Sequence, residues 1–179
     1  MEHGLKEFFG KTYWLFIVAA VIVALDQITK WLVVKYIPYG GMWSPWEWLS
    51  PYARIVHWSN TGVAFGMLQG MNPLFIGLAF IVSFGIIYYY PKVEKIDWLI
   101  KLALMLELGG AVGNLIDRFN HGHVIDFISV GNFPVWNVAD ACITVGVFIL
   151  LIGVWQQEKR EKARLAAAGQ NQSENGAVT

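Results

Sequence analysis

Four stretches of this chain are apolar for long enough to cross a lipid bilayer as helices. A span needs roughly 20 residues, because each residue of an α-helix adds about 1.5 Å to its length. The expected spans cover residues 12–36, 73–90, 98–116 and 135–155. The sequence is 56% hydrophobic and only 15% charged, which is typical of a membrane protein. We therefore expect an all-α membrane fold with four transmembrane helices.

The two ends of the chain differ in character. The first apolar stretch is longer than the core of a cleaved signal peptide and no small-residue cleavage site follows it, so we expect a retained span. Residues 1–155 then form a single integral membrane domain. Residues 156–179 are first charged and then rich in Gly, Asn, Ser and Ala, which predicts one helical extension followed by a disordered polar tail.

The segment between the first two spans, residues 40–70, is rich in Trp. Its stretch Arg54 to Trp58 favours β structure, and Asn60-Thr61-Gly62 is typical of a turn. We therefore predict a small β-sheet that lies on the membrane surface.

Lysine and arginine are distributed unevenly about the spans, and short cytoplasmic segments carry the positive excess. Nine of the 13 precede the first span, link the second to the third, or follow the fourth. They are Lys6, Lys11, Lys92, Lys95, Lys101, Lys159, Arg160, Lys162 and Arg164. Both termini are therefore expected in the cytoplasm, with residues 40–70 on the outer side.

The first span carries two charges, Asp26 and Lys30. A charge in hydrocarbon costs at least about 2.5 to 3.5 kcal/mol, so each needs a partner or a purpose. The two residues are four apart and share a helical face, where an ion pair forms readily. A structural salt bridge and a functional role both remain open.

The third span has a polar stripe near its outer end. Gly110, Asn114 and Asp117 follow i, i+4, i+7 spacing, and Arg118 is adjacent. The glycines at 109, 110 and 113 allow another helix to come close, so that Asn114 and Asp117 can hydrogen-bond across the contact. A phosphate-binding role is disfavoured, because no strand precedes these glycines and no P-loop lysine follows.

Two further carboxyl groups lie near the same membrane boundary. Asp140 shares a stripe of the fourth span with Asn137 and Thr144, and Asp126 stands between apolar neighbours just outside the third span. Carboxylates held close together in a poorly hydrated site share one proton, so one acts as a base and the other as an acid. This is the logic of an aspartic protease, although an ion path or a structural role also fits the pattern.

Other chemistries find less support. His121 and His123 lack a third ligand at a familiar spacing and Cys142 is the only cysteine, so we expect no metal and no cofactor. No serine occupies a recognisable nucleophile elbow. The 13 basic and 13 acidic residues balance, which gives no reason to expect nucleic acid as a partner. A proton-coupled transporter could use Asp26 and Glu107, but transport needs polar groups through the full membrane depth.

Five motifs occur in a fixed order along the chain: Asp26 to Lys30, Asn60 to Phe65, Gly109 to Arg118, Val124 to Phe127, and Asn137 to Asp140. Together they resemble the bacterial lipoprotein signal peptidases (signal peptidase II). The combination of all five across four spans makes the resemblance specific.

The resemblance implies a four-helix membrane enzyme with a small periplasmic β-cradle, which matches residues 40–70. It implies an aspartic endopeptidase whose catalytic pair is Asp126 and Asp140. The positions that support this pair or the substrate are Asp26, Lys30, Asn60, Gly110, Asn114, Asp117, Arg118 and Asn137.

The resemblance also implies the substrate and the location of the enzyme. The substrate is a prolipoprotein whose cysteine bears a diacylglyceryl group, cut on the amino side of that cysteine. The enzyme is expected as a monomer in contact with membrane lipid in the bacterial cytoplasmic (inner) membrane, with its active site near the outer face.

The chain departs from the family pattern at three places. The interval from Asp126 to Asp140 is short, and Trp136 stands where Phe is usual before the Asn. Both changes affect only the expected loop geometry. Glu107 lies near the middle of the third span, at a position expected to be apolar, and we expect it to make a structural hydrogen bond.

Overall fold

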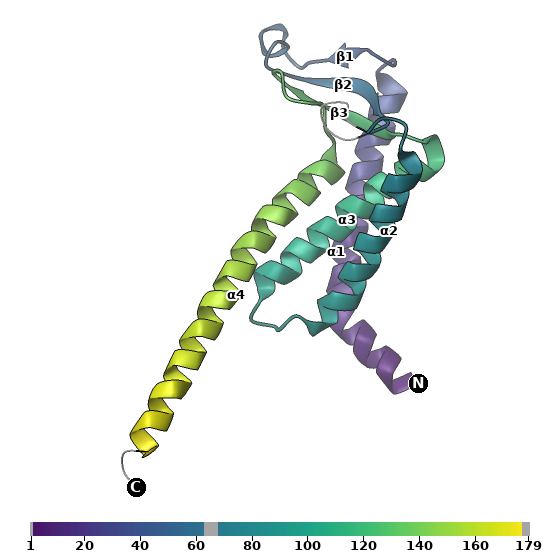
Figure 1. Cartoon of the computed structure of the whole chain (residues 1–179). Helices are drawn as coiled ribbons and strands as arrows, with labels where there is room; N and C mark the ends of the chain where they lie inside the picture. Colours follow the sequence, from purple (N-terminus) through teal and green to yellow (C-terminus); the bar gives the residue numbers. More distant parts are fainter. Residues whose placement is uncertain (1, 63–67, 177–179) are drawn as a thin grey trace.

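Four long helices form the body of the molecule (Figure 1). The structure is a computed structural model and describes residues 2–62 and 68–176. The helices are α1 (Glu2–Tyr36), α2 (Asn72–Tyr89), α3 (Trp98–His121) and α4 (Val138–Gly176). Within the described residues, four helical stretches are long and apolar enough to cross a membrane, which confirms the prediction of four spans.

Some helix ends differ from the predicted span ends. α3 continues to His121, where Gly122 adopts a left-handed conformation with φ of 75° and donates its N–H to the carbonyl of Arg118. Glycine ends helices in this way because it lacks the Cβ that makes positive φ costly. α4 begins only at Val138, because the N–H of Trp136 donates to the carbonyl of Ile128 in strand β3 (Val124–Val130).

The polar tail also differs from the expectation of a disordered segment. α4 continues as one helix to Gly176, well beyond the predicted end of the fourth span at residue 155. Residues 157–168 are rich in Ala, Glu, Lys, Arg and Gln, which are strong helix formers. Their intrinsic preference accounts for a helix that extends away from the other elements (Figure 1).

A three-stranded antiparallel sheet covers one end of the helices (Figure 1). Its order is β1 (Met42–Trp43), β2 (Ala53–Asn60) and β3. The sheet predicted within residues 40–70 is confirmed, and its third strand comes from the segment after α3. In the register of β2 and β3, Trp58 lies opposite Asp126 and Asn60 lies opposite Val124.

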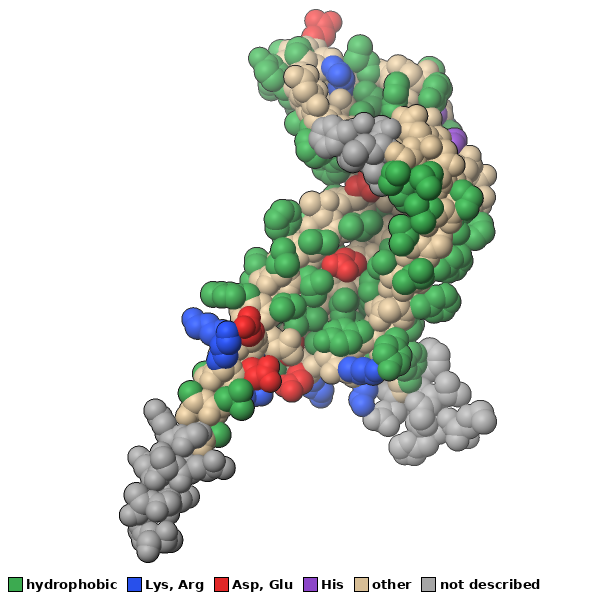
Figure 2. Space-filling model, viewed as in Figure 1, with side chains coloured by type: hydrophobic (Ala, Val, Ile, Leu, Met, Phe, Trp, Pro, Cys, Tyr) green, Lys and Arg blue, Asp and Glu red, His purple; other side chains and the backbone are tan. Residues whose placement is uncertain are grey.

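Helix α3 lies at the centre of the bundle and contacts each of the other three helices. At the end away from the sheet, Leu15, Ile86, Tyr90, Ile100 and Leu104 belong to one buried apolar cluster. The outward faces of the helices expose many large apolar side chains, as Figure 2 shows on one side of the molecule. Such faces are the natural surface of a protein whose solvent is lipid.

The glycines of α3 allow its neighbours to approach. A Cβ on Gly109 would lie 2.7 Å from the Cβ of Ile22 in α1, and one on Gly110 would lie 2.5 Å from the carbonyl oxygen of Ala139 in α4. A Cβ on Gly113 would lie 2.7 Å from Oδ2 of Asp26. The predicted packing role of these glycines is confirmed.

Helix α4 is also held at the end away from the sheet. Asp97, at the N-terminal end of α3, is buried and forms an ion pair with Arg160. Nε2 of Gln157 donates a second hydrogen bond of 3.1 Å to the same carboxylate. Close backbone packing at Gly110 therefore joins α3 and α4 near the sheet, whereas an ion pair and a hydrogen bond to Asp97 join them at the other end.

Replacing Gly110 with Ala tests the helix contact near the sheet. The added methyl group has no room beside Ala139, so we expect the protein in detergent to lose about 1 to 3 kcal/mol of unfolding free energy. Gly85→Ala in α2 is the matched control, since a Cβ there meets nothing within 4 Å. Equal stability of the two variants in denaturation experiments would contradict the close approach of α3 and α4.

Candidate active site

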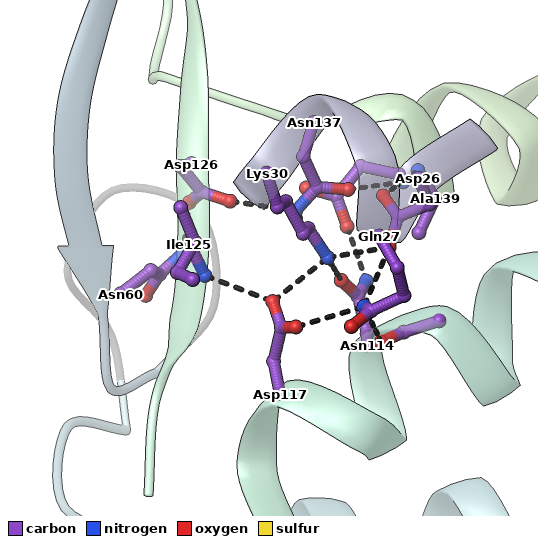
Figure 3. A network of polar contacts seen from close by, with 12 residues as sticks. Asp26, Gln27, Lys30, Asn60, Asn114, Asp117, Ile125, Asp126, Asn137 and Ala139 are labelled. Carbon is purple, nitrogen blue, oxygen red and sulfur yellow. Dashed lines mark hydrogen bonds and ion pairs between the residues drawn. The ribbon is translucent and has the colours of Figure 1, made fainter. Parts of the chain in front are cut away.

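A buried lysine stands at the centre of the polar network beneath the sheet (Figure 3). Nζ of Lys30 lies 2.7 Å from Oδ2 of Asp26, 2.8 Å from Oδ2 of Asp117 and 3.1 Å from Oδ1 of Asn114. Lys30 is 1% exposed and Asp26 is fully buried. The ammonium thus has three oxygen partners, which is the number of hydrogens it can donate. The predicted ion pair of Asp26 and Lys30 is present, and Asp117 extends it to α3.

The two carboxylates around Lys30 also accept backbone N–H groups. Oδ1 of Asp26 accepts the N–H of Ala139 at 2.9 Å, and Oδ2 of Asp117 accepts the N–H of Ile125 at 3.0 Å. Ala139 belongs to the first turn of α4, where the N–H groups have no partner within the helix and favour negative charge. The charge cluster therefore fixes where α4 and β3 begin.

Gln27 belongs to the same network, although we assigned it no role from sequence. Its Nε2 lies 2.9 Å from Oδ1 of Asp117, 3.1 Å from the carbonyl oxygen of Gly113 and 3.3 Å from Oδ2 of Asp26. The signal was present, since a polar amide within an apolar span needs a partner and Gln27 shares a helical face with Lys30.

Asp126 of β3 is held by two side-chain amides. Nδ2 of Asn137 donates to Oδ1 at 2.7 Å, and Nδ2 of Asn60 donates to Oδ2 at 3.0 Å. Asp126 is 1% exposed. Burial, and then the negative charge of Asp140, raise the pKa of Asp126 to about 7, while the two amides and the charge of Lys30 oppose the rise.

Asp140 of α4 is joined to Asp126 through two asparagines. Nδ2 of Asn114 donates to Oδ1 of Asp140 at 2.7 Å, and Nδ2 of Asn137 donates to Oδ1 of Asn114 at 3.2 Å. Oδ1 of Asn137 accepts the N–H of Asp140 at 2.9 Å, which caps the start of α4. Asn137 thus fixes both acids, because it donates to Asp126 and accepts from Asp140.

Arg118 connects the end of β2 to the helices. One guanidinium nitrogen donates to the carbonyl oxygen of Gly62 at 3.1 Å, and the guanidinium lies 4.8 Å from the ring centre of Phe75. The N–H of Gly62 donates to Oδ1 of Asn60 at 3.0 Å, so this turn also orients Asn60. The remainder of the predicted motif, Val63 to Phe65, lies outside the described residues.

A pocket of about 870 Å³ opens beside Asp140, while Asp126 lies behind its wall and does not line it. Its polar lining residues are Asp140, Asn114, Asn60, Arg118 and Thr144. The rest of the lining is mostly apolar: Val124, Val130, Phe133, Pro134, Val135, Trp136, Ala141, Ile143 and Val145. A long apolar ligand could thus lie against a small polar centre.

The structure brings nine of the predicted site residues into this one network, namely Asp26, Lys30, Asn60, Asn114, Asp117, Arg118, Asp126, Asn137 and Asp140. Gly110 takes part through its close contact with the backbone of Ala139. His121 and His123 form a separate pair, with ring centres 5.9 Å apart. Among residues 2–62 and 68–176, no three His, Cys, Asp or Glu side chains are grouped so that they could hold a metal ion.

Comparison with known proteins places this geometry in a family. Residues 18–156 match the family described as signal peptidase (SPase) II. The chain belongs to the signal peptidase II family. Its resemblance to these peptidases, which the five motifs indicate, is thereby confirmed.

Related lipoprotein signal peptidases align with most of this chain. The lipoprotein signal peptidase of Halalkalibacterium halodurans is 42% identical over 151 residues, which cover 82% of this chain and 95% of the relative. That of Brevibacillus brevis is 42% identical over 154 residues, which cover 83% and 99%. A solved bacterial membrane enzyme superposes with a TM-score of 0.75 at 27% identity, over 82% of this chain and 90% of the other. This signal peptidase II is therefore a membrane-embedded peptidase.

A titration of the carboxyl groups tests the electrostatics of the pair. We expect Asp126 to be mostly protonated at pH 6 and mostly ionised at pH 8, since its pKa is raised to about 7. Asp140→Asn should lower that pKa, because it removes the neighbouring negative charge, but burial should keep it above the usual value. Infrared difference spectra of the carboxyl stretch, with Asp126→Asn for assignment, measure both. An Asp126 that is already ionised at pH 5 would contradict the geometry.

Proposed function

We propose that this signal peptidase is an intramembrane aspartic endopeptidase with Asp126 and Asp140 as its catalytic pair. Its substrate is a prolipoprotein that already carries a diacylglyceryl group, and it cuts on the amino side of the lipidated cysteine. The observation that carries the proposal is the pair of acids joined through Asn137 and Asn114, with Asp140 on the wall of a largely apolar pocket.

The proposed reaction needs one ionised and one protonated carboxyl group. The ionised carboxylate takes a proton from water as the water oxygen attacks the peptide carbonyl carbon, and the protonated acid gives its proton to the carbonyl oxygen. The tetrahedral intermediate then collapses, and a proton passes to the leaving nitrogen as the C–N bond breaks. The products are the carboxyl end of the signal peptide and the free amino group of the lipidated cysteine.

The elevated pKa of Asp126 suits this division of roles. A value of about 7 lies far above that of an ordinary aspartate, so at neutral pH a substantial fraction of the pair holds one shared proton. Asn60 and Asn137 donate to Asp126, and Asn114 donates to Asp140, so both carboxyl groups are held in fixed orientations. Such fixed donors reduce the reorganisation needed during the reaction.

The position of the site suits a lipid-modified substrate. The acids lie where the sheet meets the ends of α3 and α4, and the pocket beside them is lined by apolar side chains from the loop before α4 and from α4 itself. A precursor held in the bilayer by its acyl chains presents its cysteine at that depth. The lipid therefore brings the scissile bond to the acids without an excursion into water.

We also propose the orientation of the enzyme in the inner membrane. The cationic excess at the end opposite the sheet supports cytoplasmic termini and an active site at the outer face. The exposed rings of Trp43 and Trp58 on the sheet, and of Trp46 and Trp48 in the segment between β1 and β2, support contact of this region with lipid headgroups. In this proposal residues 1–155 form a monomeric peptidase domain, and residues 156–179 form its cytoplasmic tail.

Conservative replacement of either acid tests the proposed chemistry. Asp126→Asn and Asp140→Asn keep the side-chain shape but remove the carboxyl group, so each should lower cleavage of a diacylated precursor by at least about 10³-fold. Purified variants in detergent are followed by mass analysis of the cut product. Glu47→Gln is the control, because Glu47 is an exposed carboxylate in the segment between β1 and β2 and is not part of the polar network of the pair.

The same assay with an unmodified precursor separates chemistry from substrate recognition. We expect cleavage of the diacylated form and little or no cleavage of the unmodified form. Full turnover by either Asn variant would overturn the catalytic pair, whereas equal cleavage of the two precursors would overturn lipid recognition alone.

A further inference from the structure

A second groove runs lengthwise between α2, α3 and α4. Its volume is about 370 Å³. The α3 side is one stripe with i, i+4, i+7, i+8, i+11 spacing, formed by Glu107, Ala111, Asn114, Leu115 and Arg118. Figure 2 shows the corresponding hollow between α4 and α2, bordered by apolar side chains.

The groove adjoins the pocket of the proposed active site. Asn114, Arg118 and Ile143 line both cavities. Asn114 is also the residue that donates to Asp140. A molecule whose reacting group lies at the acids can therefore place a second, apolar branch in the groove.

The walls of the groove suit a hydrocarbon chain. α2 contributes Phe75, Leu78, Ala79 and Val82, and α4 contributes Val147 besides Ile143. Arg118 lies 11 positions after Glu107, which corresponds to about 16 Å of helix and is comparable with the length of a long acyl chain. Among the described residues that line the groove, the polar ones are Glu107 and, toward the other end, Asn114 and Arg118.

Glu107 is an unusual residue for the inner end of such a groove. Its Oε1 is buried, and no described residue hydrogen-bonds it. The expectation from the sequence that Glu107 makes a structural hydrogen bond is therefore wrong for Oε1. Its side chain is closely packed, because a Cβ on Gly146 of α4 would lie 2.9 Å from Cγ of Glu107.

We propose that Glu107 determines how well the enzyme accepts long acyl chains. One acyl chain of the diacylglyceryl group lies in the groove, with its ester end near Arg118 and its methyl end toward Glu107. A chain long enough to pass Glu107 packs methylene groups against a carboxyl group that already lacks a hydrogen-bond partner, which is unfavourable. A shorter chain ends before that contact. The inference rests on the proposed function, because the chain is part of the proposed substrate.

Chain-length selectivity of Glu107 variants tests this inference. Two precursors of one sequence, with two palmitoyl or two lauroyl chains, are compared by the ratio of their kcat/KM values. Glu107→Met keeps an unbranched side chain but removes the carboxyl group, so the ratio of palmitoyl to lauroyl should rise on the order of tenfold. Glu107→Gln keeps a polar end and should stay near the wild-type ratio. Glu107→Ala opens the same end of the groove and should also raise the ratio.

The outcomes separate this inference from the function on which it depends. If the wild-type enzyme cuts neither precursor, the proposed function fails. If it cuts both and the Met and Ala variants keep the wild-type ratio, Glu107 does not select chain length, although the peptidase assignment stands. A rise of the same size in Glu107→Gln would show that charge or shape, rather than the polar end, sets the ratio, and would also overturn the inference.

Discussion

The ammonium of Lys30 is the contact on which the rest of this structure depends. It lies in a helix that is apolar enough to span a membrane, where an unpaired charge is costly, and it is paired with Asp26 of its own helix and Asp117 of α3. Each of these carboxylates accepts one further hydrogen bond from backbone, Asp26 at the first turn of α4 and Asp117 at β3. One buried charge therefore links α1, α3, α4 and the sheet.

This arrangement explains how two acids from different elements come together. Asp126 lies one residue after Ile125, whose N–H is bound by Asp117, and Asp140 lies one residue after Ala139, whose N–H is bound by Asp26. Displacement of either carboxylate would thus shift an acid of the pair. The choice between a structural and a functional ion pair, left open by the sequence, is in our account a false one, because the ion pair supports the site by holding its backbone.

Local sequence patterns predicted the elements better than their long-range contacts. Hydropathy and spacing indicated the four spans, the strand near Arg54 and the polar stripe of α3, because these depend on neighbouring residues. The backbone bond from Ala139 to Asp26 and the pairing of β3 with β2 join segments far apart in sequence, and no periodicity encodes them. The partners of Gln27 on α3 could not be predicted for the same reason, although its place on the helical face of Lys30 was a local signal of a polar contact. We underestimated the extent of α4 because we gave the low apolar content of residues 156–179 more weight than their helix propensity.

The most direct test of this account is the unfolding free energy in detergent of Lys30→Met, compared with a variant in which Asp26→Asn and Asp117→Asn accompany the same change. Loss of the lysine leaves two buried carboxylates without their cation, so the single variant should lose about 3–5 kcal/mol. The triple variant removes the charges while Asn oxygens can still accept the N–H groups of Ala139 and Ile125, so it should regain much of that loss. A Lys30→Met protein as stable as the wild type, or a triple variant less stable than the single one, would contradict the account.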